Sequence, residues 1–214
     1  MFKKKNNYDI LIPKFDFELD FSKLNLTQTK EYFNWYINNV DKRVEYLSVK
    51  CAGDLKIEPN KLNLAPESLK LVWQWFLNIA KTERTPKKQL KQQKIMFKDL
   101  PKSLLKQILT ENKIQFTLQT EYIIRDIAMY IAKVFLTHYP FLEWGYYTKP
   151  KSDIHVNRPV ILGFKDFRFN PVYKPVFEPV HMVAVQASKI YDKEQQGNDL
   201  FLLYSKWTQF CVSQ

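Results

Sequence analysis

Apolar side chains recur at helical spacing in three long stretches of the chain. These stretches begin near residues 28, 66 and 120 and end near residues 48, 82 and 135. In the third, apolar residues cover most of the helix circumference and leave Arg125 and Asp126 on a narrow polar side. We therefore expect the third helix to be the central and most buried one. Shorter helical patterns follow at residues 179–192 and 199–210.

Strand patterns appear in two regions. Residues 15–21 alternate strictly between apolar and acidic side chains, which is typical of an edge strand with one solvated face. Residues 142–148 and 159–164 also have strand character and are joined by a polar loop. We therefore predict an α+β fold in which three long helices pack on a small, mainly antiparallel sheet and a C-terminal helix closes the domain.

The length and composition predict one domain over residues 1–214. The chain is 45% hydrophobic and 15% aromatic, which is enough for a well-buried core. Its two cysteines, Cys51 and Cys211, are far apart and form no CxxC motif, so we expect reduced thiols. The first residues have no apolar stretch of the kind found in signal peptides. These features favour a cytoplasmic protein.

The positive charge is concentrated in one excursion at about residues 81–106. Nine basic and two acidic residues give this segment a net charge of +7, out of +11 for the whole chain. A basic patch is predicted at Lys87, Lys88, Lys91 and Lys94. The segment could be a solvated loop, could bind an acidic protein, or could bind nucleic acid or anionic lipid. Nucleic acid is the least favoured, because arginine and stacking aromatic residues are sparse there.

Several kinds of catalytic site are excluded or disfavoured. The four glycines are isolated from one another, so no phosphate-binding glycine loop and no nucleophile elbow can form in its standard pattern. His138, His155 and His181 fall in three different predicted elements without metal-binding spacing, and we expect them to be separate. The sequence therefore predicts no metal, no cofactor and no enzymatic activity. A site that assembles only in the folded chain remains the alternative.

Partner-binding candidates lie in the second half of the chain, where residue types common in binding hot spots cluster. The same aromatic residues would also serve as ordinary sheet packing. The candidates are Trp144, Tyr146, Tyr147, His155, Asn157 and Arg158.

Four short motifs within residues 60–190 suggest a relationship. They are the helix start Glu67-Ser68-Leu69, the apolar helix from Arg125 to Phe135, the strand Leu142-Glu143-Trp144-Gly145, and Asn157-Arg158-Pro159-Val160-Ile161. In these motifs the chain resembles a loosely defined group of uncharacterised bacterial α+β proteins. Some of these are encoded beside secreted toxins and are regarded as immunity proteins. The resemblance implies no catalytic residues, and for a basic immunity protein it implies a toxin with an acidic face.

Together these observations predict a non-enzymatic, cytoplasmic protein-binding protein, with toxin neutralisation as its specific form. The alternative function is association with nucleic acid through the basic segment Lys81–Lys106.

Overall fold

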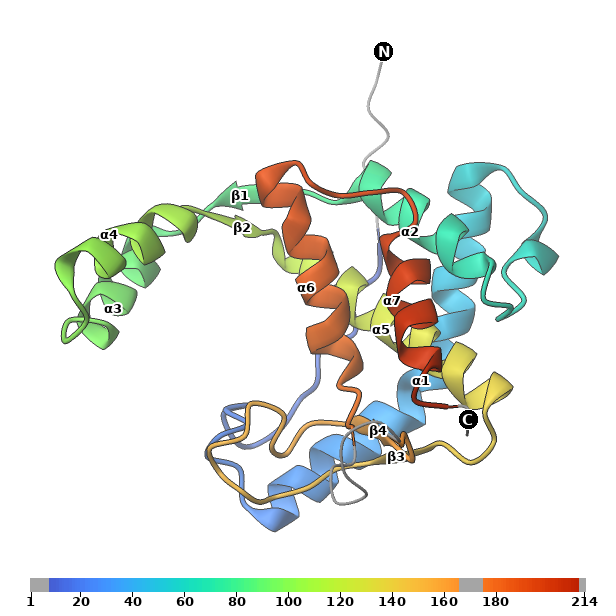
Figure 1. Cartoon of the computed structure of the whole chain (residues 1–214), viewed down its shortest axis with the longest axis horizontal. Helices are drawn as coiled ribbons and strands as arrows, with labels where there is room; N and C mark the ends of the chain where they lie inside the picture. Colours follow the sequence, from blue (N-terminus) through green and yellow to red (C-terminus); the bar gives the residue numbers. More distant parts are fainter. Residues whose placement is uncertain (1–7, 166–174, 212–214) are drawn as a thin grey trace.

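The computed structural model of the chain describes residues 8–165 and 175–211, except for the side chains of residues 107 and 111. Helices and short strands alternate along the sequence (Figure 1). The α-helices are α1 (Leu26–Leu55), α2 (Ser68–Ile79), α3 (Lys87–Met96), α4 (Lys102–Glu111), α5 (Leu118–His138), α6 (Pro179–Asp192) and α7 (Asp199–Thr208), and a 3-10 helix spans Pro59–Lys61. The strands are β1 (Thr82–Arg84), β2 (Ile114–Phe116), β3 (Glu143–Gly145) and β4 (Val160–Leu162).

Helix α5 is the centre of the body, as the sequence predicts. Every residue from Ile123 to Ala132 is buried. Helices α1, α2 and α6 pack around α5, and α7 packs against α2 and α6 (Figure 1). The apolar circumference of this helix is therefore covered by other helices.

The prediction that Arg125 and Asp126 form a polar side of α5 is wrong. Arg125 and Asp126 are 8% and 0% exposed, so this part of the helix has no solvent face. Asp126 Oδ2 accepts hydrogen bonds from Arg43 Nε at 2.9 Å and from Tyr8 Oη at 2.8 Å. Helix periodicity identified where the charges lie on the helix, but it could not show that α1 and the N-terminal segment supply partners there.

The predicted strand at residues 15–21 is also wrong. Residues 8–25 form an irregular segment, which we call the N-terminal strap, and no other described segment pairs with it in the manner of a strand. Its apolar side chains pack on α1 instead: the ring of Phe21 lies 4.9 Å from that of Tyr32, and Phe15 lies 6.0 Å from Trp35. An extended segment can direct apolar and acidic side chains to opposite faces without backbone hydrogen bonds to a neighbouring strand.

Helix α1 extends beyond its predicted limits at both ends. Its N-cap is Asn25, before the predicted start near residue 28: the Asn25 side chain accepts from Gln28 N at 2.9 Å, and the Gln28 side chain accepts from Asn25 N. The helix then continues past the predicted end near residue 48, through Cys51, and stops at Lys56 in the left-handed conformation.

The structure is mixed helix and sheet, but the sheet differs from the prediction. Strands β3 and β4 pair antiparallel as expected, with Trp144 opposite Ile161. Strands β1 and β2 form a second, separate antiparallel pair. The helices pack mainly on one another rather than on one sheet, and only α1 and α5 are long, with 30 and 21 residues.

The second strand pair supports an arm that projects from the body. We define the arm as residues 82–116: β1 leads out, α3 and α4 form a helical hairpin, and β2 returns (Figure 1). Residues 82–106 of the predicted basic excursion lie in this arm. Helix α3 was not predicted, because its polar sequence has little apolar periodicity. Within the described residues, no helix is long and apolar enough to cross a membrane.

Candidate functional site

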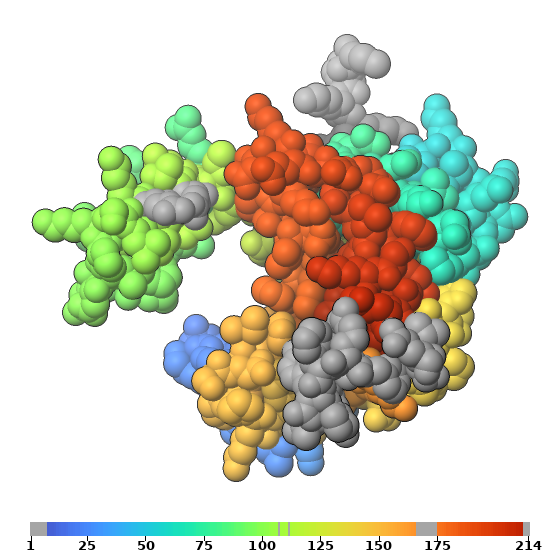
Figure 2. All heavy atoms as spheres, in the orientation of Figure 1, coloured from blue at the N-terminus to red at the C-terminus, as the bar shows by residue number. Residues whose placement is uncertain are grey.

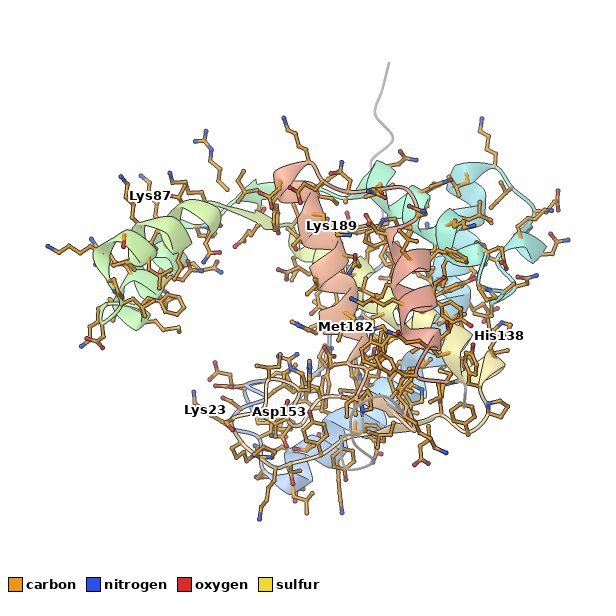
Figure 3. All side chains as sticks on the ribbon, in the orientation of Figure 1. Lys23, Lys87, His138, Asp153, Met182 and Lys189 are labelled. Atoms are coloured by element: carbon orange, nitrogen blue, oxygen red, sulfur yellow. The ribbon has the colours of Figure 1, made fainter. Side chains whose placement is uncertain are left out.

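The predicted basic patch lies on α3 and is exposed to solvent. Lys87, Lys88, Lys91 and Lys94 are all exposed, and no residue of α3 is buried. Figure 3 shows Lys87 on the arm, far from the labelled residues of the body. Figure 2 shows the arm standing clear of the body, with open space between it and the lower part of the molecule. The arm is therefore accessible to a large partner.

Apolar side chains accompany the lysines on the arm. Ile95 and Met96, at the end of α3, are 61% and 73% exposed, and Leu104 on α4 is 41% exposed. Other apolar residues, including Leu90 and Leu105, are half-buried where α3 and α4 pack together. The arm thus exposes both positive charge and apolar area that its own helix packing does not bury.

The base of the arm and α6 together line a polar pocket of about 520 Å³. Gln89 and Gln93 contribute from α3, and Ser188 and Asp192 contribute from α6. Glu121 of α5 lines this pocket and also lines a second, less polar cleft.

Two of the three predicted aromatic candidates, Trp144 and Tyr146, pack against α1. The Trp144 ring lies 5.7 Å from that of Tyr36, and the Tyr146 ring lies 4.9 Å from that of Phe33. Tyr147 donates from Oη to Asp153 Oδ1 at 2.8 Å. These contacts give all three side chains a place in the packing of the body, and their contact with a partner stays a prediction.

Asn157 holds the strap in place. It is 1% exposed and adopts a left-handed conformation with φ of 61°. Its Nδ2 donates to Phe21 O at 2.6 Å and to Leu24 O at 3.3 Å. The residue therefore connects the loop before β4 to the end of the N-terminal strap.

Two of the three histidines lie together, contrary to the expectation that all three are separate. The rings of His155 and His181 are 5.4 Å apart. Burial and the neighbouring His181 lower the pKa of His155. His138 lies elsewhere, with Nε2 3.2 Å from Leu64 O. Among the described residues, no three His, Cys, Asp or Glu side chains gather closely enough to hold a metal ion.

Arg158, the last predicted candidate, lines the second cleft, which has a volume of about 230 Å³. Its guanidinium carbon lies 4.2 Å from the centre of the Phe21 ring, and its Nε donates to Ile154 O at 3.2 Å. The N-terminal strap, α1, α5 and the start of α6 form the other walls. Their residues include Leu19, Tyr32, Leu118, Tyr122, Arg125, Glu178 and Val180.

Glu178 is the most unusual side chain of this cleft. It is 1% exposed, caps the N-terminus of α6, and accepts a hydrogen bond from His181 N. Burial raises its pKa to about 7, although the hydrogen bond and the nearby Arg158 act in the opposite direction. Buried carboxyl groups with a raised pKa in the wall of a cleft are typical of functional sites.

No known protein family, curated protein or solved structure matches this chain. Its function must therefore be argued from its own residues.

Sequence reasoning missed Arg125, Glu178 and Tyr32 as site residues. Along the sequence they lie between 11 and 157 residues from Phe21 and Arg158, so no local pattern connects them. The fold brings all of them to one cleft. One signal was present: two adjacent charges, Arg125 and Asp126, interrupt an otherwise apolar helix.

Proposed function

We propose that this protein is a non-enzymatic binding protein whose arm contacts the acidic face of a partner protein. The observation that carries the proposal is the projection of a strongly basic arm. It contains nine basic and three acidic residues, a net charge of +6 out of +11 for the chain. Like charges held together on a projecting element repel one another, and an acidic surface relieves that repulsion.

The arm contributes little to the core of the body. Helix α3 has no buried residue, and α3 and α4 pack against each other. Helices of only 10 residues are marginal in isolation, so this hairpin depends on mutual packing and on the paired strands at its base. We therefore infer that the arm contacts a partner rather than stabilises the body.

A protein partner is favoured over nucleic acid by the apolar residues of the arm. Ile95, Met96 and Leu104 are exposed beside the lysines, and protein interfaces combine an apolar centre with a polar rim. Arg84 is the only arginine of the arm, whereas arginine dominates the reading of base edges and the forked binding of phosphate.

The test compares two charge-reversed variants of equal net charge. In the arm variant, Lys87, Lys88, Lys91 and Lys94 become glutamate. In the control variant, glutamate replaces four exposed lysines of the body, namely Lys30, Lys42, Lys61 and Lys206. Each immobilised protein is exposed to nuclease-treated lysate of the source cells, and binding of a DNA duplex is measured separately over a range of salt concentrations.

The proposal predicts that the wild type and the control variant retain the same acidic protein and that the arm variant loses it. Loss in both variants would show an effect of net charge alone. Salt-sensitive binding of the duplex by the wild type, lost in the arm variant and without a retained protein, would instead establish the nucleic-acid alternative.

The identity of the partner as a toxin rests on the resemblance described above. If it holds, co-expression with a toxin gene encoded beside this one should yield a 1:1 complex that the arm variant fails to form. The proposed location is the cytoplasm, which the free thiols of Cys51 and Cys211 support.

A further inference from the structure

The cleft that Arg158 lines contains a buried arginine with an unused donor. The Arg125 side chain is 9% exposed, and its Nε is buried with no hydrogen-bond partner among the residues that the structure describes. Its Nη2 lies 3.5 Å from Asp126 Oδ1, at the limit of a hydrogen bond. Buried donors in folded proteins are almost always satisfied, so the unpaired Nε is exceptional.

Aromatic rings hold Arg125 in position. Its guanidinium carbon lies 4.6 Å from the centre of the Tyr122 ring and 5.3 Å from that of Trp35. The neighbouring Asp126 cannot fully neutralise it, because Asp126 Oδ2 already accepts from Arg43 and Tyr8. Arg125 is thus fixed and only partly compensated.

Arg158 brings a second guanidinium to the same cleft, held on the ring of Phe21. Arginine is the side chain best suited to bind a carboxylate, because its donors form a planar fork. Two arginines fixed on aromatic rings at one cleft therefore indicate an anionic ligand.

The remaining lining restricts the ligand further. Leu19, Leu118, Pro159 and Val180 make much of the cleft apolar, and its volume of about 230 Å³ suits a ring or a short chain rather than a nucleotide. Glu121 and Glu178 also line it, and their carboxyl groups would oppose a second negative charge on the ligand.

From this geometry we propose that the cleft binds a small organic monocarboxylate with an apolar or aromatic body. The carboxylate accepts from Arg125 and Arg158, and the body lies against the apolar wall. This site is independent of the arm, so its failure would leave the proposed protein-binding function untouched.

The experiment is titration calorimetry of the full chain with 3-phenylpropionate, its neutral amide 3-phenylpropanamide, and phenyl phosphate. Arg158→Met is the informative variant, because Arg158 is only half-buried and its loss should not unfold the protein. Lys42→Met, which removes one positive charge from the exposed side of α1, is the control. Circular dichroism verifies the fold of both variants.

We expect 3-phenylpropionate to bind the wild type and Lys42→Met equally, and to bind Arg158→Met at least about tenfold more weakly. Neither the amide nor phenyl phosphate should match it. Equal binding of the amide would overturn the proposal in favour of a purely apolar cleft, and tighter binding of phenyl phosphate would overturn it in favour of a phosphate site. Absence of carboxylate binding at millimolar concentration would also overturn it.

Discussion

Arg43 of α1 and Asp126 of α5 form a buried ion pair that joins the two longest helices. Arg43 Nε donates to Asp126 Oδ2 at 2.9 Å, and the two side chains are 7% and 0% exposed. Tyr8 Oη donates to the same carboxylate oxygen at 2.8 Å. One oxygen atom therefore holds α1, α5 and the N-terminal strap together.

Replacing Arg43 with methionine should destabilise the protein by about 3–5 kcal/mol, because the Asp126 carboxylate would stay buried without its counter-charge. Urea denaturation measures the free energy of unfolding. The matched control is Lys133→Met, which breaks an exposed pair between the same helices, with Lys133 Nζ 2.9 Å from Asp41 Oδ1. Its cost should be below about 1 kcal/mol. Similar losses of unfolding free energy in the two variants would show that burial does not determine how much an ion pair contributes to stability.

Glu178 should make the protein less stable as the pH rises. Burial raises its pKa from 4.5 to about 7, so the folded state binds the Glu178 proton more tightly than the unfolded state does. The resulting stability is fully present below pH 4.5 and is lost as the pH rises through about 7. At about 1.36 kcal/mol for each pKa unit, the loss is roughly 3 kcal/mol.

The measurement is the free energy of unfolding of the wild type and of Glu178→Gln at pH 5 and pH 8. Glutamine keeps an acceptor oxygen for His181 N but carries no charge. The variant should therefore gain stability relative to the wild type between the two pH values, while other titrating groups cancel in the comparison. An unchanged difference would show that Glu178 does not titrate in this range.

Two glycines should respond to alanine in opposite ways. Gly163 has φ of +103°, and an added Cβ would lie 2.8 Å from Phe141 O, so Gly163→Ala should cost about 1–3 kcal/mol. Gly53 lies in α1 with no atom within 4 Å of an added Cβ, so Gly53→Ala should stabilise by about 0.5–1 kcal/mol. Thermal unfolding of both variants tests the pair, and destabilisation by Gly53→Ala would contradict the open environment of that residue.

The body should fold without the hairpin of the arm. Arg84 pairs with Ile114 across the two strands, so an Asn-Gly turn can join these residues in place of residues 85–113. Because α3 buries nothing in the body, the free energy of unfolding should change by less than about 1–2 kcal/mol. Loss of the cooperative unfolding transition would show that the arm supports the core after all.

Local signals were sufficient for several elements of this fold. Pro179 marks the start of α6, and the observed helix has the predicted bounds of 179–192. The apolar circumference of α5 correctly indicated the centre of the body. These predictions succeeded because each depends on residues within one element.

Predictions that required a partner in space failed. Within the described part of the chain, residues 15–21 have the alternation of a strand but no neighbouring strand, and Asp126 is paired with Arg43 of α1 and Tyr8 of the strap instead of facing solvent. The cleft combines residues from the strap, α1, α5, the loop before β4 and the start of α6, and no periodicity in the sequence connects them. Arg158 was the one member that its residue type alone could indicate.

The separation of arm and body has a consequence for spectroscopy. All five tryptophans lie in the body, at positions 35, 73, 75, 144 and 207, and Phe97 is the only aromatic residue in the hairpin of α3 and α4. Intrinsic fluorescence therefore follows the unfolding of the body and is silent to events on the arm. A tryptophan at Phe97 would give the arm its own signal, and the two parts could then be observed melting as separate cooperative units.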